Sequence, residues 1–318
     1  MTLIKFLASA LIVAVAGAFI WLDLSGNGTV QVSLLVPGGG AEARLPPAGP
    51  VTADPALLED SPTGRLPRIG TDGRKPWRVY RARYKAEDAK TPRVAIVIVD
   101  LGLKAKPTRT AIRTLPPAVT LAFSPYASDL PALVRASRLR GHEVLLAVPM
   151  EPLGYPSNDP GQQTLLTSNT IDRNIWLLRW SMGRFPGYVG IVAHEGDRFL
   201  GSREHLRPVL KEVKARGLMF LDPSSAGKGE ASNLTSELKL PAAAVTGVID
   251  ADPSPATITK RLEAIAAAAK SRGYAVALGR PYPATIAALK TWLASFKAQG
   301  LVATPITSVA EGMPKPKQ

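Results

Sequence analysis

Acidic residues, with one histidine among them, directly follow several apolar segments of this sequence. Asp100 comes after the segment 94–99, and His194 and Glu195 come after the segment 188–193. If these segments are parallel strands of one sheet, their carboxyl ends meet at one edge, where α/β proteins place their chemistry. Carboxylates and an imidazole at such an edge can hold a divalent cation or supply a general base.

Four further polar residues are expected at the same edge, because each follows an apolar segment within a few positions. Glu151 lies between two prolines, Asp222 directly follows a predicted strand, and Arg280 stands two residues after another. Arg198 belongs to the polar stretch that begins at His194. We treat Glu151 as a candidate base and the other three as candidates for binding a polar substrate.

Each candidate also has a structural interpretation. Asp100 can brace the Leu-Gly turn that follows it, and His194 can be a hydrogen-bonded histidine at the rim. Glu151 can fix a loop, and Asp222 before Pro223 can form an Asx-type turn. Both interpretations stay open for these four residues.

Three other polar residues are expected to be structural. Asp250 and Asp252 stand shortly before a predicted helix and are interpreted as helix-start residues. His142 stands at the beginning of a predicted strand, and therefore at the amino edge of the sheet, opposite to the carboxyl edge where the candidate site is expected.

A regular alternation of strands and helices must position these residues. The segment 94–99 is apolar without alternation, which is typical of a strand buried on both faces of a parallel sheet. Glycines that end helices precede several of the strands. The pattern predicts an irregular (β/α) barrel with seven or eight mostly parallel strands. Strands are expected at 94–99, 118–123, 143–148, 188–193, 217–221, 244–249, 274–278 and 301–303, and helices at 107–114, 129–140, 170–183, 202–216, 255–272 and 283–299.

Composition limits the possible functions. The chain has no cysteine, which excludes disulfides, thiolate metal sites and a cysteine nucleophile. Its formal net charge is +14. Residues 62–85 carry eight basic side chains against one acidic side chain, Asp72, so half of the net charge lies in one short segment. This concentration favours a solvated tether over a nucleic-acid groove, and we expect no nucleic-acid partner.

The amino terminus resembles a membrane anchor. Residues 6–22 hold no charged side chain and follow Lys5, and their length is at the short end of the about 17–25 residues that span a bilayer. An uncleaved signal-anchor is expected; a signal peptide cleaved after Ala16 or Ala18 and a buried helix are the alternatives. The anchor predicts a single-pass inner-membrane protein whose folded domain lies in the periplasm.

The chain is expected to divide into four parts. Residues 1–24 form the anchor, and residues 25–75 read as a disordered linker because prolines and glycines interrupt any apolar period. The folded domain is expected over 76–310, with 75–84 as an arm that packs on it. Residues 311–318 are a tail.

Several motifs in a fixed order resemble the divergent polysaccharide deacetylase family over about residues 76–310. The resemblance depends on Asp-Leu-Gly at 100–102, Val-Pro-Met-Glu-Pro at 148–152, and His194 with Gly196. It also includes the segment 217–222, which ends in Asp222, and Gly-Arg-Pro at 279–281. The resemblance implies a distorted (β/α) barrel.

The resemblance also implies a divalent metal, Zn²⁺ or Mn²⁺, with Asp100 and His194 as ligands and a metal-bound water that attacks an acetyl group. The sequence departs from the family pattern at three positions. Val99 stands where the family has its first aspartate, Arg280 replaces a common histidine, and Ala193 and Glu195 flank His194 in place of Asn and Met. Glu195 or Glu151 would then have to serve as the base.

Two functions follow as expectations. One is metal-dependent deacetylation of a cell-envelope polysaccharide. The other is binding of a glycan or an envelope partner by a domain that needs no metal and does no chemistry. A binding groove could use aromatic side chains, for which the sequence offers Tyr155, Trp176, Trp180 and Tyr188.

Overall fold

The computed structural model describes residues 51–82, 90–224 and 229–310 in full, together with the backbone of three short strands nearer the amino terminus. The chain separates into two compact units, Met1–Leu45 and Pro46–Gln318. The predicted tail, 311–318, lies outside the described residues.

The first unit contains an antiparallel sheet of β1 (Ile12–Val15), β2 (Ala18–Asp23) and β3 (Gln31–Leu35). The helix predicted over residues 6–22 is therefore not confirmed, and residues 6–11, 16 and 17 of that segment lie outside the described part of the chain. No helix among the described residues is long and apolar enough to cross a membrane. The strands are rich in β-branched and aromatic residues, which favour pleated backbone.

The second unit is built on one sheet whose paired strands are all parallel. Among the described residues the strand order is β11-β10-β9-β8-β7-β6-β13-β12, with β14 paired to the first half of β6. The strands are β6 (Arg93–Leu101), β7 (Val119–Phe123), β8 (Val144–Met150), β9 (Gly190–Glu195), β10 (Met219–Asp222), β11 (Ala242–Ala244), β12 (Gly247–Val248), β13 (Tyr274–Gly279) and β14 (Val302–Thr304).

One segment joins the two ends of this sheet. β11 pairs with β10 and β12 pairs with β13, and only two residues separate β11 from β12. The backbone N–H of Val245 donates to the Asp222 carbonyl at 2.9 Å, and the N–H of Thr246 donates to the Val276 carbonyl at 2.7 Å. The strands therefore curve into a parallel half-barrel whose two ends this segment connects, and this ring of strands fits the predicted irregular (β/α) barrel.

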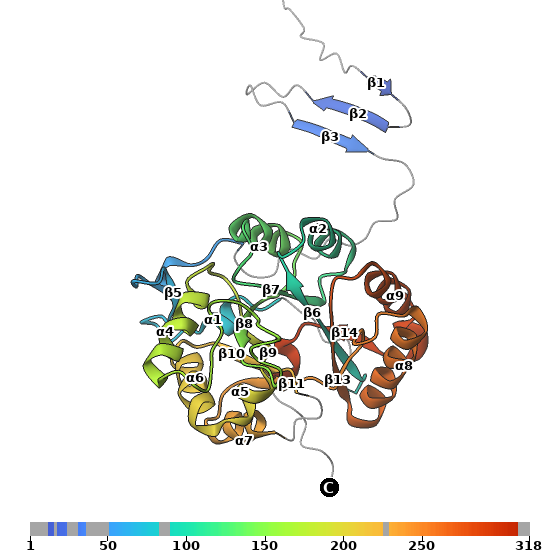
Figure 1. The fold of residues 1–318 in the computed structure, drawn as a ribbon. Coiled ribbons are helices and arrows are strands. Elements are labelled where there is room, and N and C mark those ends of the chain that lie inside the picture. The colour runs from blue at the N-terminus through green and yellow to red at the C-terminus, as the bar shows by residue number, and fades with distance from the viewer. Residues whose placement is uncertain are drawn as a thin grey trace, which may run out of the picture. The chain divides into compact units, whose positions relative to one another are not determined.

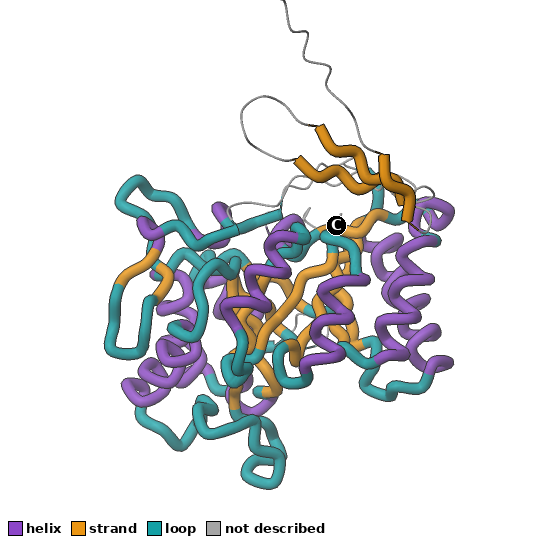
Figure 2. Tube along the Cα trace, turned by 90° about the horizontal axis from the view of Figure 1, so that it is seen from above, coloured by secondary structure: helices purple, strands orange, loops and turns teal. Residues whose placement is uncertain are grey.

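Helices surround the strands (Figures 1 and 2). The predicted helices are present at nearly the expected bounds, although the one expected over 283–299 is divided into α9 and α10, and the short helices α5, α7 and α11 were not predicted. They are α2 (Ala105–Thr114), α3 (Leu130–Leu139), α4 (Ile171–Met182), α5 (Asp197–Gly201), α6 (Arg203–Ala215), α7 (Glu230–Glu237), α8 (Pro255–Arg272), α9 (Pro283–Ala294), α10 (Phe296–Gln299) and α11 (Thr307–Ala310).

The core has two layers because side chains alternate along each strand. In β6, Val94, Ile96 and Ile98 pack with the helices, whereas the alternate residues belong to a second buried cluster inside the ring. That inner cluster includes Val97 and Val99. Residues 94–99 of β6 are all buried, so the absence of alternation in the sequence is explained by burial on both faces.

An amino-terminal arm, residues 51–82, covers the amino end of the barrel, and the prediction that 25–75 is a disordered linker is wrong for residues 51–75. The arm contains the 3-10 helix η1 (Pro55–Leu57), β4 (Leu58–Glu59), β5 (Leu66–Pro67) and α1 (Pro76–Val79). Two prolines of the arm, Pro55 and Pro76, stand in first turns, where proline favours a helix. The predicted packing of the 75–84 arm is confirmed up to residue 82, because Trp77 and Tyr80 are buried in the inner cluster.

A buried glutamate links the arm to the end of the domain. The Glu143 carboxylate is fully buried and accepts hydrogen bonds from the Ala82 N–H at 2.9 Å and the Thr307 N–H at 3.1 Å. Burial raises the pKa of Glu143. The side chain of Arg138 is also buried and donates to the Tyr80 carbonyl at 2.5 Å. These contacts close the amino end of the barrel.

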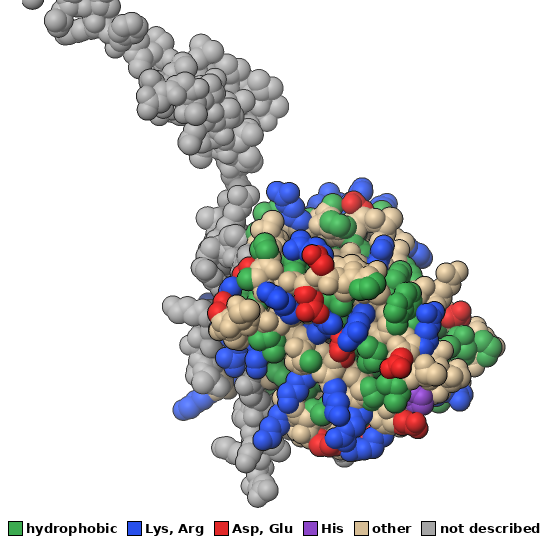
Figure 3. All heavy atoms as spheres, turned by 90° about the vertical axis from the view of Figure 1, so that its left-hand side faces the viewer, with side chains coloured by type: hydrophobic (Ala, Val, Ile, Leu, Met, Phe, Trp, Pro, Cys, Tyr) green, Lys and Arg blue, Asp and Glu red, His purple; other side chains and the backbone are tan. Residues whose placement is uncertain are grey.

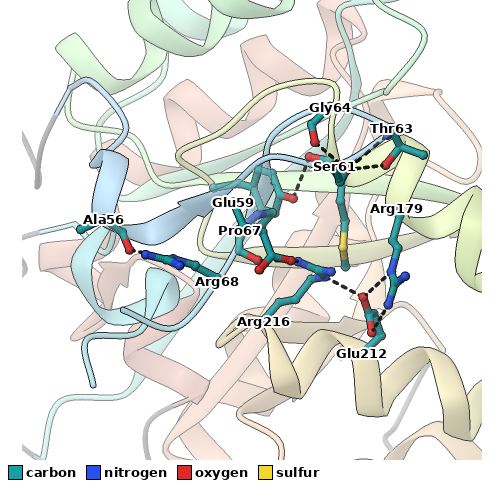
Figure 4. Close-up of polar contacts among 12 residues, drawn as sticks. Ala56, Glu59, Ser61, Thr63, Gly64, Pro67, Arg68, Arg179, Glu212 and Arg216 are labelled. Atoms are coloured by element: carbon teal, nitrogen blue, oxygen red, sulfur yellow. Dashed lines mark hydrogen bonds and ion pairs between the residues drawn. The ribbon is translucent and has the colours of Figure 1, made fainter. Parts of the chain in front are cut away.

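A chain of ion pairs holds the arm to the helices (Figure 4). Arg216 donates to Glu59 at 2.9 Å, to the Pro67 carbonyl at 2.8 Å and to Glu212 at 2.7 Å. Glu212 also accepts from Arg179 at 2.7 Å. Arg216 is only 8% exposed, so its loss would leave acceptors of the arm and of α6 with little access to water.

Replacing Arg216 by alanine should lower the free energy of unfolding by about 2 kcal/mol, because Glu212 and the Pro67 carbonyl lose a hydrogen-bond donor that is almost fully buried. The matched control is Arg207→Ala, which breaks an exposed pair with Glu237 at 2.7 Å and should cost at most about 1 kcal/mol. Urea unfolding of the full chain measures both. Equal effects would show that the arm is held by its apolar contacts alone.

Candidate functional site

Asp100 stands at the carboxyl end of β6 in strained backbone. Its φ is 60°, in the left-handed region that non-glycine residues rarely adopt. The pairing of β6 with β7 shifts register between Ile98 and Leu101, which marks a β-bulge at this point. Bulges re-aim side chains at the rims of barrels. Glu195, at the end of β9, has a similar φ of 58°.

The Asp100 carboxylate lies between a histidine and an arginine. Its Oδ1 is 3.0 Å from His194 Nδ1, and its Oδ2 accepts from Arg280 Nε at 3.1 Å. Burial would raise the pKa of Asp100, but His194 and Arg280 together lower the pKa below its ordinary value. Asp100 is therefore an ionised carboxylate whose counter-charge comes from Arg280.

A second aspartate, Asp250, contacts the same arginine. Its Oδ2 accepts from the Arg280 backbone N–H at 2.6 Å and from Thr285 Oγ1 at 2.8 Å. Its Oδ1 lies 3.7 Å from Arg280 Nη1, and its side chain has no exposed surface. This burial raises the pKa of Asp250. Arg280 thus bridges the carboxyl end of β6 and the segment after β12.

Glu151 belongs to a separate cluster. Its Oε2 accepts from both the N–H and the hydroxyl of Thr167 at 2.6 Å, and its Oε1 lies 3.5 Å from Arg198 Nε. The N–H groups of Arg198 and Phe199 donate to the Glu151 carbonyl, each at 3.1 Å. Glu151 therefore fixes the loop after β8 and the start of α5, as its structural interpretation predicts.

Asp222 lies in a third place, buried at the end of β10. Its Oδ1 accepts from the N–H of Ser224 at 3.0 Å, and the Ser224 hydroxyl also donates to it. Its Oδ2 accepts from the hydroxyl of Ser232 at 3.2 Å. The i to i+2 bond confirms the predicted Asx-type turn. Glu195 is half-buried beside His194.

The structure thus brings together three of the seven candidates, Asp100, His194 and Arg280. It adds Asp250, which the sequence analysis assigned wrongly to a helix start. Asp252 does have that role, because it accepts from Ser254 N–H at 3.0 Å just before α8. The signal for Asp250 was present, since it follows an apolar strand directly, just as Asp100 does.

These residues do not fit a divalent metal as they stand. Asp100 and His194 are in contact, but the guanidinium of Arg280 engages the second oxygen of Asp100. No group of three or more His, Asp or Glu residues that could hold a metal ion is found in the part of the chain that the structure describes. Val99, at the position of the family's first aspartate, is buried inside the ring.

Exposed apolar side chains line the same edge. Leu103, Tyr126, Leu153 and Tyr282 are 53, 37, 68 and 40% exposed. They follow β6, β7, β8 and β13, which are consecutive in the sheet order β13-β6-β7-β8. We call these four residues the carboxyl-edge rim. Exposed apolar side chains after four consecutive strands make this edge a candidate binding surface.

The aromatic residues proposed for a groove lie in different surroundings. Tyr188 is buried and its hydroxyl donates to the Met182 carbonyl, so it is a core residue. Trp176 is exposed, with the Arg173 guanidinium 4.7 Å from its ring. Trp180 packs against Tyr126, a rim residue, with ring centroids 5.8 Å apart. Tyr155 is half-buried.

The fold and this edge define an α/β barrel protein whose polar cluster lies at the carboxyl ends of its strands. Residues 96–310 match the divergent polysaccharide deacetylase family. Because the match covers more than half of the chain, the protein belongs to this family.

Three relatives share this region. The uncharacterized protein YibQ of Escherichia coli is 25% identical over 199 residues, which are 62% of this chain but only 61% of YibQ. An uncharacterized protein of Haemophilus influenzae is 23% identical over 213 residues, 67% of this chain and 75% of that protein. The crystal structure of uncharacterized protein ATU2773 from Agrobacterium tumefaciens is similar with a TM-score of 0.74 and 32% identity, covering 77% of this chain and 99% of that chain.

Replacing Asp100 by asparagine, which tolerates its positive φ, should lower the free energy of unfolding by about 2 kcal/mol at neutral pH. The pKa of Asp100 is lower in the folded state than in the unfolded chain. The ionised Asp100 therefore adds to the free energy of unfolding above the ordinary pKa of about 3.9, and this contribution is lost as the pH falls through the lowered pKa of the folded state. Urea unfolding should therefore show a difference in the free energy of unfolding between the wild-type chain and Asp100→Asn that decreases below about pH 4. A gap of constant size in acid would contradict the Asp100–Arg280 assignment.

Proposed function

We propose that this domain binds a polysaccharide of the cell envelope at the carboxyl edge of its barrel and does not hydrolyse it. The observation that carries the proposal is the ion pair between Arg280 and Asp100. A cation that belongs to the protein itself already neutralises the carboxylate that the family resemblance assigns to a metal.

Hydrolysis of an acetyl group needs a group that polarises the carbonyl and a base that activates water. Asp100 is bound by Arg280, and Val99 is aliphatic and buried. Neither Asp100 nor Val99 therefore holds a metal that polarises the carbonyl or acts as the base. The Glu151 carboxylate is bound by Thr167 and Arg198. Glu195 remains as a carboxylate beside His194, but a base alone does not polarise a carbonyl.

The carboxyl-edge rim supports glycan binding. Sugars present apolar C–H faces that pack against aromatic and aliphatic side chains, and their hydroxyls bond to polar groups nearby. The rim supplies apolar side chains for the sugar faces, and the cluster around Asp100 supplies polar groups for the hydroxyls. On the face seen in Figure 3, basic, acidic and hydrophobic side chains are interspersed, with no continuous basic surface.

We also propose that the domain acts in the periplasm, tethered to the inner membrane by the apolar segment 6–22. Its support is the sequence alone: an uncharged apolar segment that follows Lys5. Protease added to spheroplasts should then degrade residues 51–310. Degradation only after the inner membrane is permeabilised would contradict this location.

The purified full chain should bind peptidoglycan sacculi or soluble N-acetylglucosamine oligosaccharides, and Leu153→Ser with Tyr282→Ala should weaken binding by about tenfold or more, equivalent to about 1.4 kcal/mol. Isothermal titration and sedimentation with sacculi measure this. The matched control is Leu139→Ser, because Leu139 is 56% exposed at the end of α3, on the amino side of the barrel.

Acetate release should stay at background with Zn²⁺ or Mn²⁺ added. Acetate release that disappears in an Asp100→Ala, His194→Ala variant would overturn the proposal in favour of metal-dependent deacetylation. An equal loss of binding in Leu139→Ser would contradict the assignment of the ligand to the carboxyl edge.

A further inference from the structure

Two tryptophans and two arginines form a row along α4 and the residues that follow it. Arg173, Trp176 and Trp180 are spaced by three and four positions, so their side chains leave the same side of the helix. The Arg173 guanidinium is 4.7 Å from the centre of the Trp176 ring. Arg184 follows the helix, and its guanidinium is 5.2 Å from the centre of the Trp180 ring. We call Arg173, Trp176, Trp180 and Arg184 the α4 platform.

The α4 platform faces solvent although it is rich in aromatic surface. Trp176 is 42% exposed, and both arginines are exposed. The helix packs on the core through other residues, among them Leu177 and Leu178. Tryptophan and arginine are the side chains that most often carry binding energy at interfaces, and large apolar side chains that gather on a surface mark binding sites.

Tyr126 joins the α4 platform to the carboxyl-edge rim. It is one of the four rim residues, and its ring centre is 5.8 Å from that of Trp180. The loop after β8 fixes its position, because the Gln163 N–H donates to the Tyr126 hydroxyl at 2.9 Å. Gly161 of the same loop lies so close that a Cβ on it would be 2.7 Å from the tyrosine ring. A platform held in this way loses little freedom when a ligand binds.

The two arginines give the α4 platform a positive charge that the protein does not cancel. Arg179 of the same helix is paired with Glu212 at 2.7 Å, but neither Arg173 nor Arg184 forms an ion pair within the described part of the chain. Arg184 Nε donates to the Pro125 carbonyl at 3.1 Å, which orients the guanidinium and leaves its charge. Guanidinium groups stay protonated and bind carboxylates well, so the platform is complementary to an anionic ligand.

We propose that the α4 platform is a second binding site for the glycan, and that this glycan is a strand whose sugars carry carboxylates. The strand passes from the carboxyl-edge rim over Tyr126 onto α4, where sugar rings stack on Trp180 and Trp176 and carboxylates pair with the arginines. Arg173 and Trp180 are about 10 Å apart along the helix axis, so the platform is longer than a single sugar. This inference rests on the proposed glycan-binding function and deepens it by naming the class of glycan and its path.

The test is isothermal titration of the full chain with two hexasaccharides of equal length. One contains only N-acetylglucosamine, and in the other N-acetylglucosamine alternates with glucuronic acid. The wild-type chain should bind the acidic hexasaccharide about fivefold more tightly at low salt, because two partly exposed ion pairs form. This preference should disappear at about 0.5 M salt, which screens such pairs.

Two sets of substitutions separate stacking from charge. Trp176→Ala should weaken the binding of both hexasaccharides by about tenfold, because both lose the same aromatic surface. Arg173→Gln with Arg184→Gln should remove the preference for the acidic hexasaccharide and leave the affinity for the neutral one nearly unchanged. Arg173→Gln alone should reduce the preference, and it serves if the double variant is unfolded by circular dichroism.

Matched controls come from the same helix and from the same residue type. Ile171 has the same exposed fraction as Trp176, 42%, but it lies about 160° around the helix from Arg173. Arg272→Gln makes the same change of charge at the end of α8. Ile171→Ala and Arg272→Gln should bind both hexasaccharides as the wild-type chain does.

The two proposals fail in different ways. Wild-type binding without preference for the acidic hexasaccharide, or wild-type affinity in Trp176→Ala, would overturn this inference alone if Leu153→Ser with Tyr282→Ala still weakens binding. Equal losses in Ile171→Ala and Trp176→Ala would also overturn it. A wild-type chain that binds neither hexasaccharide nor sacculi would overturn the glycan-binding function itself.

Discussion

The ion pair between Asp100 and Arg280 is the interaction on which the arrangement of the carboxyl edge depends. An ionised carboxylate that is mostly withdrawn from water needs a counter-charge at short range. Arg280 supplies it from the residue directly after β13, the neighbour of β6. His194 reaches the same carboxylate from β9, which is three strands away in the order β6-β7-β8-β9. One strained residue thus connects both sides of the barrel mouth.

The two ends of the barrel have different tasks. At the amino end, the arm and α11 bury apolar side chains and satisfy the carboxylate of Glu143 with backbone and hydroxyl donors. At the carboxyl end, polar groups are only partly satisfied and apolar side chains reach solvent. Closing one end makes the domain stable, while the other end keeps surface for a ligand.

The strands and long helices could be predicted because burial and helix ends leave local signals. The uninterrupted apolar run of β6 indicated burial on both faces, and Gly273 and Gly300 end helices in the left-handed conformation that favours glycine. The part of the arm before residue 75 was missed because its buried residues, such as Leu57 and Leu66, follow no period. Prolines that begin its helices resemble linker prolines when only the sequence is read.

The site could be predicted residue by residue but not contact by contact. Asp100 and His194 were found because each follows an apolar strand. Their pairing with Arg280, and the addition of Asp250, depend on which strand ends face one another across the ring, and this is set by strand order and stagger. A sequence pattern identifies what ends each strand, whereas it does not identify which ends meet.

The most direct test of the metal-free account is a crystal structure of the wild-type chain grown with excess Zn²⁺, with anomalous diffraction recorded at the zinc edge. The account predicts no anomalous peak at the cluster and Arg280 in contact with Asp100. A peak about 2 Å from both Asp100 and His194, with the arginine displaced, would contradict it.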